Sequence, residues 1–459
     1  MSRLVVVSNR VADPRRVAAG GLAVALGDVL AASGGLWFGA DAEVAEDGCS
    51  AASQLRTQQA GRVTLATVVL GRTDHDRYYR GYANGVLWPV FHYRLDLAQF
   101  DAAHLEGYRR VNRLFAQQLR PLLHPDDVVW VHDYHLIPLA ADLRALGCHQ
   151  RIGFFLHIPL PPPLILAALP AHDWLIRSLF AYDLVGLQSQ ADLSHLRRYL
   201  AVEARADLLS DNLFGAFNRV LRADAFPIGI DVAEFEAMTQ AAPAQKTLAM
   251  LREQYAQRRL LVGVDRLDYS KGLPQRLRAM QALLERHPEA RHSATLIQVA
   301  APSREGVDAY GDIRRELEGL AGAINGDFGD LDWMPVRYLH RTMARNRVPG
   351  LYRASRVALV TPLRDGMNLV AKEFIAAQDP ADPGVLVLSR FAGAAEQLTD
   401  ALLVNPYDTE ATAEAIRGAL QMPLQERQVR HKRLLAEIRC HDVHWWRRTF
   451  LDTLTETRA

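Results

Sequence analysis

The sequence contains few cysteines and no long apolar segment. Only three cysteines occur among 459 residues, Cys49, Cys148 and Cys440, and they form no Cys-x-x-Cys pair. Neither a disulfide framework nor a cysteine-based zinc site is therefore indicated. No run of about 18 apolar residues occurs, so the sequence predicts no membrane span. The apolar stretch at the N-terminus is too short for a signal peptide, and we expect a soluble, cytoplasmic protein.

The chain also has almost no net charge. Lys and Arg number 53 against 52 Asp and Glu, which gives a formal net charge of +1. Because no strong field of one sign results, we expect neither nucleic-acid nor membrane binding. Hydrophobic residues make up 49% and charged residues 23%, as is ordinary for a globular enzyme. A chain of this length is expected to form two or three domains.

Short apolar strands alternate with helical patterns along the whole chain. This alternation predicts an α/β fold of two Rossmann-like, doubly wound domains, with ligands at the carboxyl ends of the strands. The predicted strands are 4–8, 63–70, 128–132, 152–157, 184–187, 260–264, 295–299, 336–339, 357–360 and 385–388. The predicted helices are 104–120, 191–200, 273–286, 308–321, 369–378 and 409–420.

The expected domain boundary lies near the middle of the chain. Residues 226–231, Phe-Pro-Ile-Gly-Ile-Asp, and the Ala/Gln/Pro stretch 238–246 are typical of an interdomain connection. We therefore predict an N-terminal domain over 1–235 and a C-terminal domain over 236–439. The final amphipathic stretch, 440–459, is expected to pack back on the N-terminal domain.

The segment 361–373, Thr-Pro-Leu-Arg-Asp-Gly-Met-Asn-Leu-Val-Ala-Lys-Glu, carries the strongest local signal. An apolar strand stops at Pro362, and a helical pattern begins at about Asn368 after a turn. A helix N-terminus offers free N–H groups and a partial positive charge, so it can bind a phosphate without a metal. Asp365 could meet sugar hydroxyls there or merely cap the helix. Glu373 could belong to the same site or be a solvated surface charge.

Positively charged residues follow strands in both halves of the chain. Arg266 and Lys271 share one strand-to-helix loop, and Arg304 follows the next strand. Arg10 ends the first strand and precedes a glycine pair that permits close backbone approach. Arginine binds a phosphate through two parallel N–H groups, and lysine supplies a point charge. One such residue would more simply be a surface ion pair, but four at strand ends favour phosphate or diphosphate binding.

Polar residues also end two strands of the first half. His132-Asp133-Tyr134-His135 follows one of them, and its His-x-x-His spacing allows a metal site, although no further ligand pattern accompanies it. Asp133 better fits an acceptor of hydrogen bonds from substrate hydroxyls. His157 ends the next strand, where a core histidine is the default interpretation, but the stiff Pro-rich segment that follows strengthens the case for a substrate contact.

Seven motifs occur in a fixed order. They are Ser-Asn-Arg (8–10), Gly-Gly-Leu (20–22), Leu-Trp-Pro-Val-Phe-His-Tyr (87–93), His-Asp-Tyr-His (132–135), Phe-Leu-His-Ile-Pro (155–159), Arg-Leu-Asp-Tyr-Ser-Lys-Gly (266–272) and Arg-Asp-Gly-Met-Asn-Leu-Val-Ala-Lys-Glu (364–373). Together, from about residue 2 to 450, the chain resembles glycosyltransferase family 20, the trehalose-6-phosphate synthase family. The resemblance implies the glycosyltransferase-B fold, two Rossmann-like domains facing a central cleft. It places a nucleotide-sugar donor on the C-terminal domain and glucose 6-phosphate on the N-terminal domain.

The resemblance also implies an activity. A retaining transferase would move glucose from UDP-glucose to glucose 6-phosphate, giving α,α-trehalose 6-phosphate and UDP, with no metal and no cofactor. Retention could arise by double displacement or by front-face attack, the route usually assigned to the family. No Asp-x-Asp phosphatase signature follows the 369–378 helix, so a separate trehalose-6-phosphate phosphatase is the expected pathway partner. A homo-oligomer is also expected.

Other functions are weighed against this one. Within the same fold, a related transferase could make glucosylglycerol phosphate or another phosphorylated glucoside. In a different class, the chain could be a non-catalytic nucleotide-sugar sensor. A dinucleotide oxidoreductase is disfavoured, because no strand is followed by Gly-x-Gly-x-x-Gly.

Site residues carried over by position fall into three sets. The expected acceptor set is Arg10, Tyr79, Trp88, Asp133 and Arg304, with Arg10 and Arg304 on the 6-phosphate. The expected donor set is Gly20, Gly21, His157, Arg266, Lys271, Met343, Asp365, Gly366, Met367, Asn368, Leu369, Val370 and Glu373. The residues expected to carry catalysis are Asp133, His157, Arg266, Lys271 and Asp365, and no metal ligand is expected.

The donor set divides further by the part of the donor each residue would hold. Arg266, Lys271, Gly21 and the amides of Leu369 and Val370 would hold the diphosphate. Asp365 and the three following amides would hold the transferred glucose, with His157 near its 6-hydroxyl, and Glu373 would bind the ribose. Met343 stands where an aromatic residue often contacts the base, and the loop 11–19 is short for the family.

Overall fold

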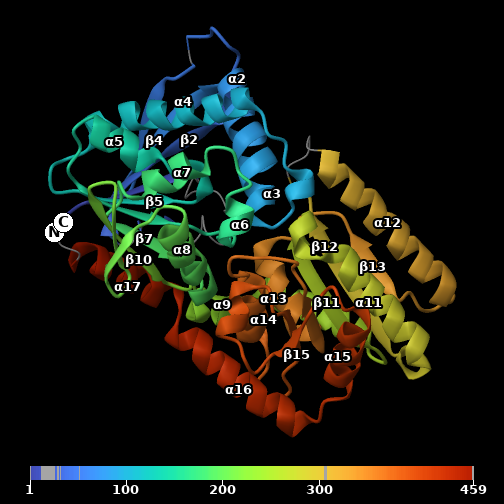
Figure 1. Cartoon of the computed structure of the whole chain (residues 1–459). Helices are drawn as coiled ribbons and strands as arrows, with labels where there is room; N and C mark the ends of the chain where they lie inside the picture. The colour runs from blue at the N-terminus through green and yellow to red at the C-terminus, as the bar shows by residue number, and fades with distance from the viewer. Residues whose placement is uncertain are drawn as a thin grey trace. The chain divides into compact units, whose positions relative to one another are not determined.

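The chain folds as two compact α/β units (Figure 1). The computed structural model describes residues 2–11, 26–27, 30, 33–50, 52–303 and 308–456. The first unit is Met1–Pro227 with Trp446–Ala459, and the second is Ile228–Trp445. Each unit is built on a parallel-rich sheet, so the predicted α/β class with two such sheets is confirmed.

The first unit contains a ten-stranded sheet of order β3-β4-β2-β1-β5-β6-β7-β10-β9-β8. The pairs from β4 to β10 are parallel, and β3, β9 and β8 pair antiparallel with their neighbours. The central strands are continuous apolar runs, which a sheet buried on both faces requires. The strands are β1 (Leu4–Arg10), β2 (Gly35–Ala45), β3 (Leu55–Ala60), β4 (Val63–Gly71), β5 (Val128–His132), β6 (Arg151–Phe155), β7 (Leu184–Leu187), β8 (Asp207–Ser210), β9 (Leu213–Ala216) and β10 (Arg219–Ala225).

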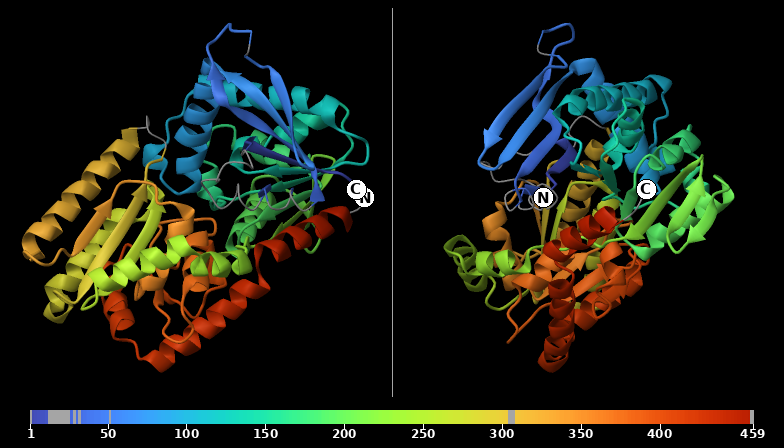
Figure 2. Two further views of the ribbon diagram at one scale, coloured as in Figure 1. Left: turned by 180° about the vertical axis from the view of Figure 1, so that it is seen from behind. Right: turned by 90° about the vertical axis from the view of Figure 1, so that its left-hand side faces the viewer.

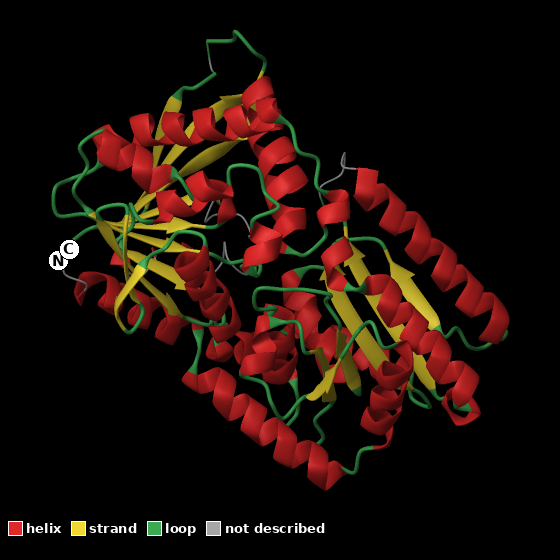
Figure 3. Cartoon of the chain, in the orientation of Figure 1, coloured by secondary structure: helices red, strands yellow, loops and turns green. Residues whose placement is uncertain are grey.

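Helices cover this sheet (Figure 3). They are α2 (Arg72–His75), η1 (Asp76–Leu87), α3 (Trp88–Phe91), η2 (Leu95–Leu97), α4 (Ala102–Leu119), η3 (Arg120–Leu122), η4 (Tyr134–Leu136), α5 (Leu139–Ala145), α6 (Pro163–Leu166), α7 (His172–Leu179) and α8 (Gln190–Val202). Two of the longer ones begin at a side-chain cap. Asp101 accepts a hydrogen bond from Ala103 N at the start of α4, and Ser189 accepts one from Asp192 N at the start of α8.

The last helix, α17 (Val443–Glu456), packs on this sheet from Trp446 onward (Figure 2, red). Two glycines in the strands make room for it. A Cβ added at Gly153 would lie 2.8 Å from Phe450, and one at Gly186 would lie 2.7 Å from the same ring. Phe450 and Leu454 are fully buried there. The expected return of the C-terminal stretch therefore has a clear physical basis in small strand residues that accept large helix residues.

The second unit contains a six-stranded parallel sheet of order β13-β12-β11-β14-β15-β16. Its strands are β11 (Arg259–Arg266), β12 (Ala294–Ala301), β13 (Val336–Leu339), β14 (Val357–Val360), β15 (Val385–Ser389) and β16 (Leu402–Val404). Its helices are α9 (Val232–Gln240), α10 (Ala242–Gln254), η5 (Tyr269–Lys271), α11 (Leu273–Arg286), η6 (Pro288–Ala290), α12 (Asp308–Phe328), η7 (Arg345–Arg347), α13 (Val348–Ala354), α14 (Leu369–Ala377), η8 (Gly393–Glu396), α15 (Thr409–Gln421) and α16 (Leu424–Cys440). None of the helices in the described part of the chain is long and apolar enough to cross a bilayer.

The connection between the units agrees with one of the two segments expected for it, since the division falls within 226–231, and differs for the other. The prediction of a linker over 238–246 is wrong, because these residues form the end of α9 and the start of α10. Pro243 lies in the first turn of α10, where a missing N–H costs nothing. The units divide at Pro227/Ile228 rather than after residue 235, since α9 packs against α13 and α14 of the second unit.

Candidate active site

Two loops of the second unit lie together at the carboxyl ends of β11 and β14. The first runs from Arg266 through η5 to Gly272, and the second spans 361–368, between β14 and α14. A backbone hydrogen bond joins them, because Leu363 N donates to Ser270 O at 2.8 Å. The two strands are neighbours in a parallel sheet, so both loops emerge at the same edge.

The shape of the first loop is fixed from inside. Asp268 accepts hydrogen bonds from Ser270 N at 2.9 Å and from the Tyr310 hydroxyl at 3.2 Å. Gly272 has a φ of +62°, and a Cβ there would stand 2.0 Å from Thr361 O. Only glycine fits at this close approach of the two loops.

Asp365 lies at the centre of the second loop. Its Oδ2 accepts hydrogen bonds from Lys271 Nζ at 2.6 Å and from Asn368 Nδ2 at 3.0 Å. The Lys271 and Asp365 side chains are only 12% and 13% exposed, so solvent screens this ion pair weakly. The structure therefore brings together two residues that the sequence could only place on separate loops.

The segment after β15 supports the second loop from behind. Asp365 N donates to Phe391 O at 3.2 Å, and Gly393 N donates to Asp365 O at 3.1 Å. Ala394 N donates to Met367 O at 2.8 Å, and a Cβ at Gly393 would stand 1.8 Å from Gly366 O. The backbone from Asp365 to Met367 is therefore held on both sides.

The N-terminus of α14 begins at this loop. Asn368 is its N-cap, with φ +82° and a side chain that accepts from Ala371 N at 3.3 Å. The alternative reading of Asp365 as the helix cap is therefore wrong. Leu369 and Val370 occupy the first two helical positions, whose N–H groups have no acceptor within a helix. Their amides supply the partial positive charge of the helix end.

Glu373 lies one turn further along α14 and is not an exposed surface charge. Burial raises the pKa of its carboxyl to about 7, against the opposing effect of Arg345. The Tyr352 hydroxyl lies 3.5 Å from its Oε2. Such a carboxyl changes charge near neutral pH, as site residues often do.

Arg266 and Met343 stand at the same strand edge. Arg266 is the exposed last residue of β11 and directly precedes the first loop. Met343 is half-buried in the loop that follows β13. Both therefore follow strands of the parallel sheet on the side that carries Lys271 and Asp365.

A buried arginine beneath the two loops was missed by sequence reasoning. Arg276 of α11 is 0% exposed and donates to Asp265 at 2.6 Å, to Gln298 at 2.8 Å and to Thr361 at 3.0 Å. These acceptors belong to β11, β12 and the end of β14, so one guanidinium joins the carboxyl ends of neighbouring strands. The available signal was its position, because Arg276 falls on the buried apolar stripe of its helix.

In the first unit, Asp133 is the centre of the strand-end cluster after β5. It has φ +75° and ψ 165°, a conformation that costs a non-glycine residue about 1–3 kcal/mol. Its Oδ1 accepts from Tyr134 N at 3.0 Å and from His157 N at 3.3 Å. The Asp133 side chain thus bonds to the backbone of His157, which joins two expected site residues.

Aromatic rings connect the expected acceptor residues. Tyr79 of η1 stacks on His135 with ring centroids 5.8 Å apart, and His135 lies 3.9 Å from the Tyr134 ring. Trp88, at the start of α3, lies 5.7 Å from the same Tyr134 ring. Tyr79, Trp88 and Asp133 are therefore grouped around Tyr134 and His135, and the latter two were not expected to be linking residues.

Arg10 ends β1 beside this group. The Tyr78 hydroxyl donates to Asn9 Oδ1 at 2.9 Å, which ties the strand end to η1. The pKa of His75 is lowered mainly by burial, with a smaller contribution from the charge of Arg10. Since the His75 ring lies 5.3 Å from that of Tyr79, Arg10 is near the acceptor aromatics. Gly20, Gly21 and Arg304 lie outside the described residues.

The His-x-x-His pair does not act as one unit. His132 contacts His157, whereas His135 contacts Tyr134 and Tyr79. Across the described ranges, no cluster of three or more His, Cys, Asp or Glu residues has the geometry to hold a metal ion.

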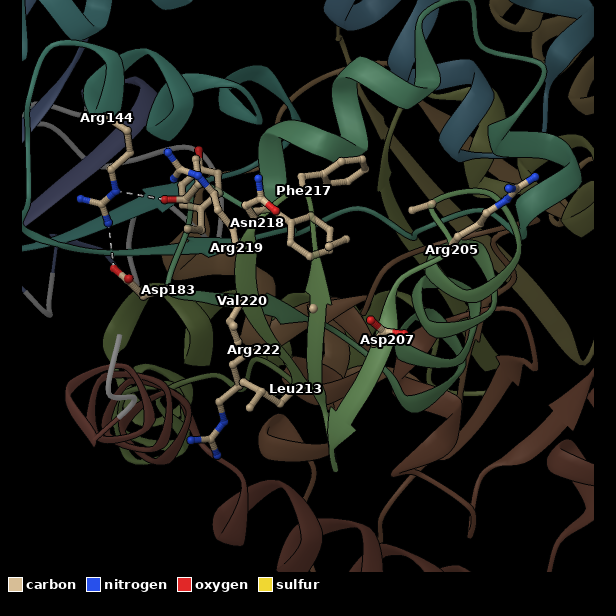
Figure 4. Close-up of a pocket in the computed structure, with 16 residues that line it drawn as sticks. Arg144, Asp183, Arg205, Asp207, Leu213, Phe217, Asn218, Arg219, Val220 and Arg222 are labelled. Atoms are coloured by element: carbon tan, nitrogen blue, oxygen red, sulfur yellow. Dashed lines mark hydrogen bonds and ion pairs between the residues drawn. The ribbon is translucent and has the colours of Figure 1, made fainter.

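A separate cavity of about 630 Å³ lies elsewhere in the first unit (Figure 4). It is lined by Arg144, Asp183, Phe217, Arg219 and their neighbours. Asp183 directly precedes β7, so this cavity is at the amino end of that strand, where parallel sheets do not usually place their sites. Arg144 is already bonded to Asp183 at 3.0 Å.

Two doubly wound units with charged loops at the carboxyl ends of their strands define a sugar-nucleotide transferase of the glycosyltransferase-B class. The family described as glycosyltransferase family 20 matches residues 8–456. The chain belongs to glycosyltransferase family 20.

Similar proteins extend over the whole length. A trehalose-6-phosphate synthase of Cronobacter sakazakii is 48% identical over 458 residues, covering 99% of this chain and 96% of that protein. The crystal structure of an α,α-trehalose-phosphate synthase (UDP-forming) from Burkholderia xenovorans in complex with glucose 6-phosphate has a TM-score of 0.95 and 49% identity, covering 99% and 100% of the two chains. A structure from E. coli bound with UDP-2-fluoro glucose has a TM-score of 0.94 and 47% identity, with 99% of each chain covered.

Proposed function

We propose that this protein transfers glucose from UDP-glucose to glucose 6-phosphate, giving α,α-trehalose 6-phosphate and UDP. The observation that carries the proposal is the meeting of Lys271, Asp365 and Asn368 at the N-terminus of α14. A cation, a sugar-binding carboxylate and a helix end are the groups that a nucleotide-sugar donor requires. The full-length similarity to synthases, including one in complex with glucose 6-phosphate, supports the same assignment.

The cationic groups would act on the leaving diphosphate. As the bond from C1 to the diphosphate breaks, negative charge grows on the phosphate oxygens. Arg266, Lys271 and the amides of Leu369 and Val370 would stabilise that charge. The backbone of the loop that carries Lys271 is held in place before the reaction by its own hydrogen bonds, so it needs little reorganisation when the charge develops. We therefore infer that the reaction needs no divalent ion.

The remaining donor contacts would be made by polar groups of the same edge. Asp365 and the amides of Gly366, Met367 and Asn368 would bind the hydroxyls of the transferred glucose. Glu373, one turn inside α14, would bind the ribose hydroxyls, and Met343 would lie against the base. Support comes from the order of these residues along one strand-turn-helix, which matches the order of sugar, diphosphate and ribose in the donor.

Most of the acceptor contacts would come from the first unit. Arg10 and Arg304 would bind its 6-phosphate, Tyr79 and Trp88 would contact the sugar, and Asp133 would accept a hydroxyl hydrogen bond. The strained backbone of Asp133 supports a role in the site, because such strain persists where function requires it. His157 would orient the donor glucose near its 6-hydroxyl.

A front-face route accounts for retention with these groups. The acceptor hydroxyl would attack C1 on the side from which the diphosphate leaves, and a leaving phosphate oxygen would take its proton. A double displacement would instead need a carboxylate behind C1.

The decisive experiment is a matrix of donors and acceptors. UDP-, GDP- and ADP-glucose would each be incubated with glucose 6-phosphate and with glycerol 3-phosphate, and the products identified by mass spectrometry and NMR. We expect α,α-trehalose 6-phosphate from UDP-glucose and glucose 6-phosphate. Glucosylglycerol phosphate as the main product would overturn the acceptor assignment, and no turnover with any pair would overturn the enzymatic one.

A further inference from the structure

His132 and His157 contact each other at the carboxyl ends of β5 and β6. His132 Nδ1 lies 3.1 Å from His157 Nε2, and the rings are stacked with centroids 5.3 Å apart. His132 is 0% exposed, whereas His157 remains partly accessible. His132 therefore lies behind His157 and cannot itself reach a ligand.

The contact restricts the protonation of both rings. Burial lowers the pKa of His132 well below its usual value and that of His157 to about 3, so both are neutral near pH 7. One of the two facing nitrogens must then carry the proton and the other must accept it. Within the part of the chain that the structure describes, the second nitrogen of His157, Nδ1, has only a long contact of 3.4 Å with Gln188. It is consequently the nitrogen of His157 that can bind a substrate hydroxyl.

Besides His157, rings from two elements pack against His132. Trp130 of β5 lies 4.6 Å from its ring, and Trp446 of α17 lies 6.3 Å away. The Trp446 ring is also 6.0 Å from His157 and makes an edge contact at 5.1 Å with Phe155 of β6. Trp446 is fully buried. The helix that returns from the end of the chain thus forms one wall around the histidine pair.

Hydrogen bonding within this wall is sparse. Among the described residues, His132 Nε2, Trp130 Nε1 and Trp446 Nε1 have no hydrogen-bond partner. The bond to His157 is consequently the hydrogen bond that sets the orientation of the His132 ring, and ring packing does the rest. A turn of either imidazole would leave further buried nitrogens unpaired, at a cost of about 1–3 kcal/mol each.

We propose that His132 is a positioning residue that fixes the tautomer and orientation of His157, and that Trp446 of α17 holds it in place. The proposal rests on the proposed contact between His157 and the donor sugar. It explains why the polar ring of His132 is buried among aromatic side chains directly behind His157. It also gives the C-terminal helix a part in the reaction beyond stability.

Kinetics test the proposal through the difference between two replacements of His132. Asn places an amide at the distance from the backbone where His carries Nδ1, so H132N can keep the bond to His157, whereas H132L cannot. We expect H132L to lower kcat by roughly 10- to 100-fold, with the KM for glucose 6-phosphate changed less than about twofold. H132N should keep most of the wild-type kcat. In a protein that already carries H157A, H132L should cause little further loss of kcat. Unchanged kcat in H132L, equal losses in both variants, or full additivity with H157A would overturn the proposal.

A spectroscopic measurement is independent of turnover. In the full chain labelled with ¹⁵N-histidine, His157 should show the shifts of one neutral tautomer near pH 7, and averaged shifts would contradict the proposal. The ¹⁵N shifts of His157 should be averaged between the two tautomers in W446A, whereas W446F should keep the shifts of one tautomer. H172L serves as the control, because His172 makes a similar side-chain bond to Tyr199 at 2.5 Å on α7, away from the strand ends. If the wild type shows no transferase activity but His157 shows one tautomer, the proposed function fails while the positioning stands.

Discussion

Lys271 Nζ lies 2.6 Å from Asp365 Oδ2, so two residues expected to hold different parts of the donor are paired with each other. Their side chains are little exposed, and the pair links the loops after β11 and β14. A donor diphosphate that takes up the lysine would release the carboxylate for a sugar hydroxyl. Recognition of the phosphate and recognition of the glucose would thereby be coupled through one ion pair.

Removal of the lysine should impair donor use strongly. K271A is expected to lower kcat/KM for UDP-glucose by about 10²-fold or more, because a charge that stabilises the leaving group is lost. Steady-state kinetics measure the effect, and K432A, which removes an exposed lysine of α16, is the control. Near-wild-type kinetics in K271A would remove Lys271 from the site.

The affinity for UDP should depend on the charge of Glu373. Its pKa is raised to about 7 by burial, so the carboxylate that accepts ribose hydroxyl bonds is lost as the pH falls below 7. We expect the Kd of UDP to increase from pH 8 to pH 5.5 in the wild type, measured by calorimetry. The same profile should be flatter in E373Q. Parallel profiles of the two proteins would show that Glu373 does not contact the ribose.

The Glu373 carboxyl should also affect the stability of the fold, with a pH dependence opposite to its effect on UDP binding. Its folded-state pKa lies above the unfolded value, so its contribution is full below about pH 4.5 and is lost as the pH rises to about 7. E373Q should therefore be more stable than the wild type at pH 8, by up to about 3 kcal/mol, and should gain nothing at pH 4.5. Thermal unfolding at both pH values checks this, and Lys372, present in both proteins, cancels in the difference. An E373Q that is less stable at pH 8 contradicts the burial argument.

The close approach of the two loops should be sensitive to a single methyl group. G272A places a Cβ 2.0 Å from Thr361 O at a positive φ. We expect a loss of about 2 kcal/mol or more in unfolding free energy and a fall in kcat/KM for the donor. G418A is the matched control, since Gly418 is an exposed position of α15 and its Cβ would meet nothing within 4 Å; it should stabilise by about 0.5–1 kcal/mol. Equal behaviour of the two variants would refute the close approach.

The activity should survive chelation of metal ions. Arg266, Lys271 and the N-terminus of α14 supply the positive charge that a divalent ion would otherwise provide. We expect the same turnover in excess EDTA as without it, measured as the rate of UDP release. Loss of activity that Mg²⁺ restores would sink the metal-free account.

Most of the parallel strands were predictable from the sequence, although β2, β10 and β16 were missed, and the exposed edge strands were not predictable. β5, β7, β13 and β14 were predicted with the observed bounds, because buried parallel strands are continuous apolar runs. β8, by contrast, is exposed at all four residues, and β3 is exposed at its four central ones. Such strands have no apolar run that distinguishes them from loops, so the antiparallel edges of the first sheet were missed.

The turn between β14 and α14 was predictable from the local sequence, whereas contacts between distant residues were not. Pro362, Asp365 and Asn368 predicted the turn before α14. The ion pair between Lys271 and Asp365 joins positions 94 residues apart, and only the sheet order brings them together. Arg276 was missed for the same reason, since its three acceptors lie in β11, in β12 and directly after β14.

The return of α17 to the first sheet has a consequence for synthesis on the ribosome. Residues from Trp446 onward emerge only after the whole of Ile228–Trp445 has been made, which takes on the order of 10 s or more. During that interval the apolar face of β5 and β6, with Trp130 and Phe155, lacks its cover. The second unit can finish folding first. Until α17 has been made, the uncovered apolar face of the first unit must be protected by chaperones, or synthesis must be fast.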